Sequence, residues 1–193
     1  MTPEYEYDNA LFEYRQATDE DFDNFERETK LKLPENFKEF IKEAGTKSPD
    51  PDTFPISGHP IDDCSDCQSF YGFPGETLKE GADEDQVRSN AETCSLLGEG
   101  PNDGDALLCN WKTFRGRVPS DLLPFGSSSF GDQICLKLEG DDAGSVWIWF
   151  NDEEVEPEGD EIPRDNCYFC ANSLEEFLEG FVDEEDFYDD EDE

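Results

Sequence analysis

The fold is decided by residues 122–153, which read LLPFGSSSFGDQICLKLEGDDAGSVWIWFNDE. From Gln133 to Leu138 polar and apolar side chains alternate, and this period of two predicts a strand with two distinct faces. Residues 146–150, VWIWF, are apolar at every position and predict a central strand that helices cover on both faces. The polar segment EGDDAGS between the two strands favours a turn, so we expect an antiparallel hairpin, with a further turn before Gln133.

Helical patterns lie on both sides of this hairpin. Residues 18–29 begin with Thr18 as a cap, followed by acidic residues that suit the positive end of a helix. Residues 34–45 place Pro34 in the first turn and then repeat aromatic and aliphatic side chains at helical spacing. Residues 172–181, NSLEEFLEGF, combine a Ser-x-x-Glu capping box with a continuous apolar face, which predicts a closing helix.

The remaining segments give weaker patterns. Residues 46–60 are rich in proline and glycine and are expected to be irregular. Short strands are expected at residues 68–73 and 106–110, and a helix at residues 83–93. Two helices, a sheet and a closing helix, in that order, predict a single α+β domain with a mainly antiparallel sheet.

The chain is strongly acidic, with 52 Asp and Glu against 14 Lys and Arg and a formal net charge of −38 on 193 residues. Such a charge repels DNA, RNA and anionic membrane surfaces, and it favours a basic partner or a salty environment. Low hydropathy with high charge is also typical of disorder. However, 13% of the residues are aromatic and they occur in periodic blocks, so we expect a folded domain with an acidic surface.

The charge pattern also suggests the domain boundaries. Residues 183–193, DEEDFYDDEDE, form an acidic tail, and the first 182 residues alone carry a net charge of −29. We therefore expect an N-terminal extension at residues 1–17, a folded domain at residues 18–182 and the tail. The N-terminus has no signal-peptide pattern and no apolar run reaches the roughly 20 residues of a membrane span, so we expect a cytoplasmic protein with reduced cysteines.

Four blocks of the chain, taken in order, resemble the SUKH superfamily. They are KLPENFKEFIKEAG at 32–45, LLPFGSSSFGDQICLKLEG at 122–140, VWIWFNDE at 146–153 and NSLEEFLEGF at 172–181. The resemblance spans residues 18–181 and implies a SUKH-like α+β fold. Its members include a yeast cell-wall assembly regulator and many bacterial immunity proteins, whose partners are toxins, often nucleases.

The resemblance therefore implies an immunity protein that binds and neutralises a basic toxin domain by occluding it. The alternative is an acidic regulatory or scaffold protein of the same fold, whose charge reflects adaptation to salt. A nuclease site is a basic groove that holds a polyphosphate, and an acidic domain can occupy such a groove and associate with it quickly. The partner is thus expected to be a protein, not a nucleic acid or a membrane.

Residue patterns for catalysis are weak. The single histidine, His59, lies between Gly58 and Pro60 and fits a turn residue better than a catalytic base. The glycine-rich stretches lack the Gly-Lys-Ser/Thr ending of a phosphate-binding loop, and the acidic loops do not follow the spacing of an EF-hand. We therefore do not expect an enzyme.

The cysteines offer one candidate metal site. Cys64 with Cys67, and Cys167 with Cys170, form two C-x2-C pairs that could hold a structural zinc ion through four thiolates. The pairs are about 100 residues apart, so only the fold could bring them together, and four independent reduced thiols are the alternative. The other three cysteines lie in apolar contexts and are expected to be buried core thiols: Cys94, Cys109 and Cys135.

Lys112, Arg115 and Arg117 form a small basic cluster in the segment NWKTFRGR. Local neutralisation of the acidic surface is one interpretation of this cluster. Phosphate binding is the other, and the overall negative charge disfavours it.

Overall fold

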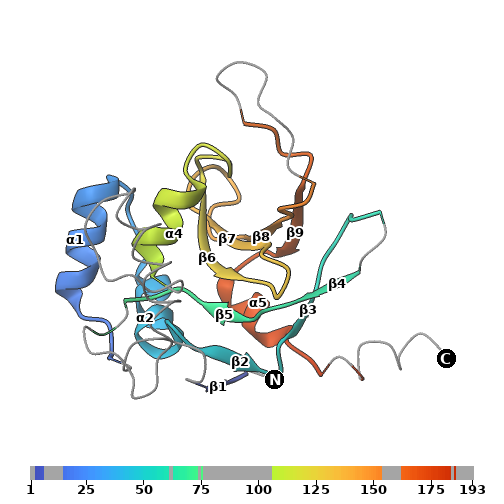
Figure 1. Cartoon of the computed structure of the whole chain (residues 1–193), viewed down its shortest axis with the longest axis horizontal. Coiled ribbons are helices and arrows are strands. Elements are labelled where there is room, and N and C mark those ends of the chain that lie inside the picture. Colours follow the sequence, from blue (N-terminus) through green and yellow to red (C-terminus); the bar gives the residue numbers. More distant parts are fainter. Residues whose placement is uncertain are drawn as a thin grey trace, which may run out of the picture.

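The computed structural model describes residues 3–6, 15–60, 63–73, 75, 106–153, 162–183 and 185. At its centre is a five-stranded antiparallel sheet with the strand order β5-β6-β7-β8-β9 (Figure 1). These strands are β5 (Ser69–Phe70), β6 (Leu122–Ser127), β7 (Gln133–Lys137), β8 (Val146–Trp149) and β9 (Cys167–Ala171). The predicted hairpin is confirmed, because β7 pairs with β8 in an antiparallel register that sets Gln133 opposite Trp149. The predicted short strand at residues 68–73 is confirmed as β5.

Strand β7 has two distinct faces, as predicted, and both are buried from Gln133 to Leu136. Ile134 and Leu136 enter the main hydrophobic core, whereas Cys135 enters a second, smaller cluster on the other face. Gln133 is only 2% exposed, and its side-chain oxygen accepts a hydrogen bond of 2.8 Å from the hydroxyl of Tyr71. This bond offsets the cost of burying a polar side chain, so polarity alone was a poor guide to exposure here.

Strand β6 occupies residues for which the sequence predicted a turn. Pro124 lies inside this strand, and the pairing of β6 with β7 shifts its register between Pro124 and Gly126. A proline interrupts a ladder of hydrogen bonds, and a bulge accommodates the interruption. The prediction of a turn was therefore wrong because a strand with an irregular register tolerates the proline.

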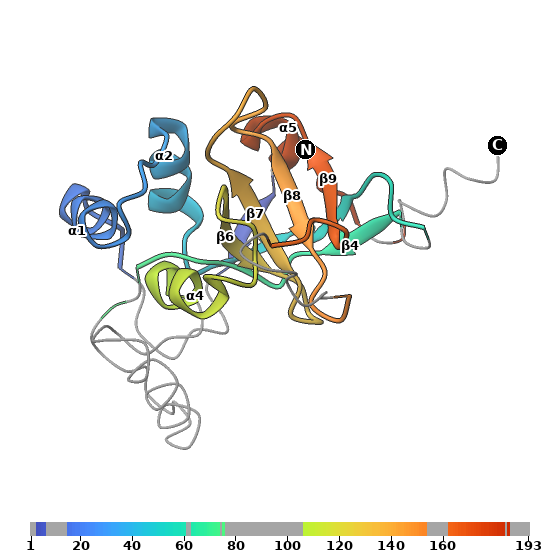
Figure 2. The ribbon, with the colours of Figure 1, turned by 90° about the horizontal axis from the view of Figure 1, so that it is seen from above.

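The predicted helices are confirmed as α1 (Asp19–Thr29), α2 (Glu35–Ala44) and α5 (Leu174–Glu179). At the start of α1, Thr18 and Asp21 form a reciprocal capping box, which satisfies backbone groups that the helix leaves open. Helices α2 and α5 pack their aromatic side chains against one face of the sheet, where Phe37 and Phe177 both contact Phe125. Helix α1 lies beside α2 (Figure 2).

Helix α4 (Leu107–Phe114) replaces the strand that the sequence predicted at residues 106–110. Leu107, Trp111 and Phe114 follow helical spacing once the segment is considered as a whole, whereas the short apolar run alone fits either structure. Helix α4 lies beside β6 (Figure 2) and brings Phe114 to the second cluster, next to Trp149. The helix expected at residues 83–93 lies outside the described residues.

Short strands also occur in the segment that was expected to be irregular. They are β2 (Ser48–Asp50) and β3 (Thr53–Pro55), followed by β4 (Cys64–Asp66), which pairs with β3. Strand β2 pairs with β1 (Glu4–Glu6), so part of the N-terminal extension joins the domain. The tail is described only at residues 183 and 185. No helix among the described residues is long and apolar enough to cross a membrane.

Candidate functional site

One end of the central sheet combines a tight turn with an exposed aromatic side chain. The turn of residues 128–132 joins β6 to β7, and the residues that follow β8 lie next to it because Gln133 is opposite Trp149. The backbone N–H of Asn151 donates a hydrogen bond of 3.0 Å to Oδ1 of Asp132. This bond ties the end of β8 to the turn.

Ser128 and Asp132 hold the turn closed. Both are buried, with exposed fractions of 1% and 5%. The Ser128 hydroxyl donates to Oδ2 of Asp132 over 2.8 Å, and the same hydroxyl oxygen accepts from the backbone N–H groups of Phe130 and Asp132. Gly131 has a φ of +89°, a conformation that glycine adopts without strain. The turn is thus a closed hydrogen-bonded unit.

Phe130 projects from this turn and is 86% exposed. Its neighbour Ser129 is anchored to β4, because the backbone N–H and the hydroxyl of Ser129 both donate to Oδ2 of Asp66, at 3.0 and 2.5 Å. The sequence treated Phe130 as one residue of a turn, and nothing in its local pattern signalled that an aromatic ring would be exposed.

His59 packs close to the same end of the sheet. Its imidazole stacks on the ring of Phe150, with 4.7 Å between the centroids, and meets Tyr168 edge to face. Nε2 of His59 lies 3.3 Å from one carboxylate oxygen of Glu153, and the Tyr168 hydroxyl donates to the other at 3.0 Å. The His59 side chain is 3% exposed, so it functions as part of an aromatic cluster that fixes the segment after β8.

Each member of the basic cluster has a partner within the protein. Lys112 of α4 forms an ion pair with Glu28 of α1, and Arg115 lies over the ring of Trp111. Arg117 lies over the rings of both Phe114 and Trp149, at 5.2 and 5.3 Å from the ring centroids. These contacts agree with the interpretation of the cluster as local neutralisation and packing.

A hollow of about 180 Å³ lies between α4 and β6, beside Arg115. Its walls are mostly apolar and include Leu31, Trp111 and Pro124. The volume is below the roughly 300–1,000 Å³ of typical small-molecule pockets, so the hollow does not indicate a cofactor site.

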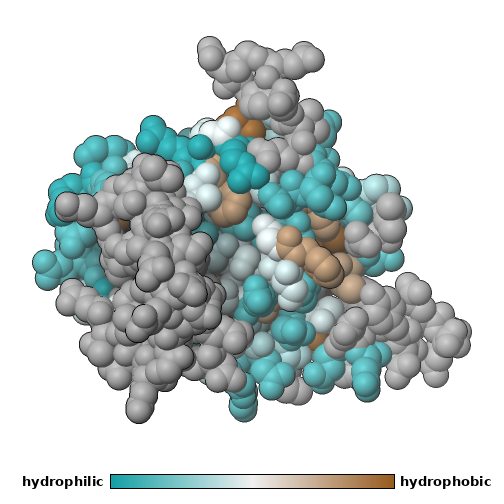
Figure 3. All heavy atoms as spheres, in the orientation of Figure 1, coloured by the Kyte–Doolittle hydropathy of each residue, from teal (hydrophilic) through white to brown (hydrophobic). Residues whose placement is uncertain are grey.

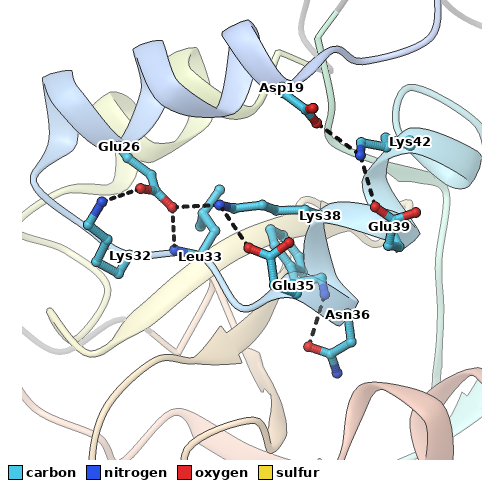
Figure 4. A network of polar contacts seen from close by, with 10 residues as sticks. Asp19, Glu26, Lys32, Leu33, Glu35, Asn36, Lys38, Glu39 and Lys42 are labelled. Atoms are coloured by element: carbon cyan, nitrogen blue, oxygen red, sulfur yellow. Dashed lines mark hydrogen bonds and ion pairs between the residues drawn. The ribbon is translucent and has the colours of Figure 1, made fainter.

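Several acidic residues of α1 and α2 form polar contacts with nearby lysines (Figure 4). Glu26 of α1 accepts hydrogen bonds from Lys32, from the backbone N–H of Leu33 and from Lys38 of α2. Burial disfavours the ionised form of Glu26, but these hydrogen bonds outweigh it and lower the pKa of Glu26 to about 2. Hydrophilic residues cover most of the described surface in Figure 3.

The structure does not assemble the four cysteines of the two C-x2-C pairs into one site. Cys67 is buried in the main core, whereas Cys167 belongs to the second cluster with Cys135 and Trp149. Among the described residues, no three His, Cys, Asp or Glu side chains are grouped so that they could hold a metal ion. The fold therefore gives the shared zinc site no support.

Burial also controls the chemistry of these thiols. It raises the pKa of Cys167 to about 11, and it raises the pKa values of Cys135 and Cys170 as well. Cys135 is a buried core thiol, as predicted. The prediction was wrong for Cys109, which is half-buried on α4 and takes part in a disulfide, and Cys94 lies outside the described residues.

Comparisons with known proteins agree with this fold. The chain is 25% identical over 182 residues to the SPbeta prophage-derived uncharacterized protein YokK of Bacillus subtilis (strain 168), a match that covers 86% of this chain and 76% of the relative. No solved structure gives a significant match. The model of the SMI1 / KNR4 family (SUKH-1) matches residues 16–180, which include both N-terminal helices, the whole central sheet and α5. The chain therefore belongs to the SMI1 / KNR4 family (SUKH-1), and the resemblance inferred from its sequence is confirmed.

Proposed function

We propose that this chain is an immunity protein that binds a cognate toxin of the nuclease class and neutralises it by occlusion. Membership of the family supports the proposal, because bacterial SUKH proteins include many immunity partners of toxins. The observation that carries it is the net charge of −38 on a chain that folds into an α+β domain. The charge is borne by the folded layers, for instance by exposed Glu20 and Asp23 on α1 and Glu39 on α2.

The proposed mechanism is competition for a basic groove. A nuclease holds its polyphosphate substrate with lysine and arginine side chains, and the carboxylates of this chain can occupy the same side chains. Opposite charges steer the two proteins together, so association is expected to be fast at low ionic strength. The mechanism needs no cofactor and no catalytic group in this chain. The proposed location is the cytoplasm, where the protein would protect nucleic acid.

Co-expression is the test of this proposal. A candidate toxin domain of the nuclease class, sought in the gene next to that of this chain, is expressed alone and together with the chain, and cell survival is counted. Survival is expected only with the chain present, and an inactive toxin variant is the control for the burden of expression. Failure of the chain to protect would contradict the proposal.

Binding kinetics test the electrostatic part separately. The association rate between the purified chain and the inactive toxin domain is expected to fall about tenfold or more between 50 and 500 mM NaCl, since salt screens exposed charges. An association rate that is indifferent to salt would contradict the role given to the acidic surface.

A further inference from the structure

Phe130 is the one large apolar side chain that stands exposed in the described part of the chain, at 86%. Single exposed apolar residues are common on protein surfaces, so exposure alone indicates nothing about function. What distinguishes Phe130 is the turn that carries it. Two buried polar residues, Ser128 and Asp132, form the hydrogen bonds of this turn, and Phe130 lies at its tip.

The hydrogen bonds of the turn fix the backbone at Phe130 before any partner arrives. The Ser128 hydroxyl accepts from the N–H of Phe130 itself at 3.2 Å, and Asp132 is bonded both to that hydroxyl and to Asn151. On the other side, Ser129 is bonded twice to Asp66 of β4. The backbone is thus held on one side of Phe130 to β4 and on the other to the segment after β8, and a side chain on a rigid support loses less conformational entropy on binding.

The surroundings of Phe130 are mostly acidic. Asp66 contacts the turn directly, and exposed Asp152 follows Asn151, whose N–H is bonded to the turn. Arg117 also reaches this end of the sheet, where it donates to the Asn151 side chain at 3.0 Å, so among the described residues these carboxylates lie near a cation as well.

We infer that Phe130 is the anchor of the surface that contacts the partner protein. Its ring inserts into an apolar pocket of a basic protein, and the acidic residues around the turn face basic side chains at the rim of that pocket. Protein interfaces take most of their binding energy from a few well-packed central residues, many of them aromatic. The inference rests on the proposed function, since it takes the toxin domain as the partner.

The test compares the unmodified chain, Phe130→Ala and Asn24→Ala in binding to the purified inactive toxin domain at 150 mM NaCl. Phe130→Ala is expected to weaken binding at least tenfold, mainly through faster dissociation. Its thermal midpoint is expected to stay within about 2 °C, because the ring is exposed. Asn24→Ala truncates an exposed, uncharged side chain on α1 and is expected to change Kd less than threefold.

The salt dependence of Kd is a second measurement, because a variant that had lost charge would show a different salt dependence. The Phe130→Ala substitution removes no charge, so the slope of log Kd against log salt is expected to equal that of the unmodified chain. A loss of binding below tenfold, or an equal loss in Asn24→Ala, would overturn the inference while the proposed function stands. Absence of binding by the unmodified chain would contradict the proposed function, and this inference with it.

Discussion

Lys38 of α2 reaches Glu26 of α1, with 3.0 Å between Nζ and Oε1. The same carboxylate accepts from the backbone N–H of Leu33 at 3.1 Å, in the segment that joins the two helices. The Glu26 side chain therefore links α1 both to α2 and to the segment between the two helices. The Glu26 side chain is 9% exposed, so water contributes few hydrogen bonds to its carboxylate.

Substitution of this carboxylate is expected to destabilise the domain. Glu26→Gln keeps the shape of the side chain but removes the charge that Lys32 and Lys38 contact, and we expect a loss of about 2 kcal/mol in the free energy of unfolding at pH 7. This loss in the free energy of unfolding should become smaller as the pH falls. The pKa of Glu26 is lowered from 4.5 to about 2 in the folded protein, so its contribution is complete above pH 4.5 and is lost as the pH falls toward 2.

Urea titrations of both proteins at pH 7, 4 and 3 measure this difference. Asp23→Asn, at an exposed position of the same helix, is the control and is expected to change stability by less than about 0.5 kcal/mol. A Glu26→Gln difference that stays constant down to pH 3 would show that the ionised carboxylate is not the stabilising group.

Asp132 is expected to be essential to the turn that carries Phe130. Asp132→Ala leaves the buried Ser128 hydroxyl and the part-buried Asn151 N–H without their acceptor, and we expect a loss of about 2 kcal/mol. Asp152→Ala removes the same charge from an exposed position nearby and should cost less than about 0.5 kcal/mol. Chemical denaturation measures both, and equal effects of the two substitutions would argue against a structural role for Asp132.

The sequence predicted the parts of this fold that periodicity specifies. Helix α1 has its own cap at Thr18, and strand β8 has an apolar side chain at every position, so each is defined locally. Strand β6 and helix α4 were misassigned for opposite reasons: Pro124 resembles a turn residue, and the short run around Leu107 fits two periods. Only contacts with β7 and with the core determine that β6 is a strand and α4 a helix. The position of Phe130 depends on hydrogen bonds from Ser129 to Asp66, which is distant in the sequence.

The buried thiols are expected to resist alkylation. The pKa of Cys167 is raised to about 11, and that of Cys135 is raised as well, so both thiols are protonated at pH 8 and poorly nucleophilic. Iodoacetamide treatment of the native protein, followed by mass spectrometry, should label half-buried Cys64 on β4 first. Labelling of Cys135 and Cys167 should require denaturant, and rapid labelling of either in the native protein would contradict their burial.

Metal content is expected to be below one zinc ion per chain. Cys67 and Cys167 belong to separate hydrophobic clusters, and a thiol with a raised pKa is a poor source of the thiolate that zinc requires. Elemental analysis of the purified protein measures the zinc content. Thermal melting with and without a chelator should give the same midpoint within about 1 °C, and stoichiometric zinc together with a lowered midpoint would restore the shared site.

Stability at low salt separates the proposed inhibitor from a protein whose acidity is an adaptation to salt. Some of the ion pairs use carboxylates that are largely shielded from water, such as Glu26 with Lys38 of the neighbouring helix, and salt screens such pairs less than exposed ones. We therefore expect a cooperative thermal transition at 20 mM NaCl, with a midpoint that rises by only a few degrees up to 2 M as salt screens the repulsion between exposed carboxylates. Circular dichroism measures the transition, and potassium chloride is the control for a specific effect of sodium. Loss of the folded state at 20 mM salt, with recovery at 2 M, would favour salt adaptation as the origin of the charge.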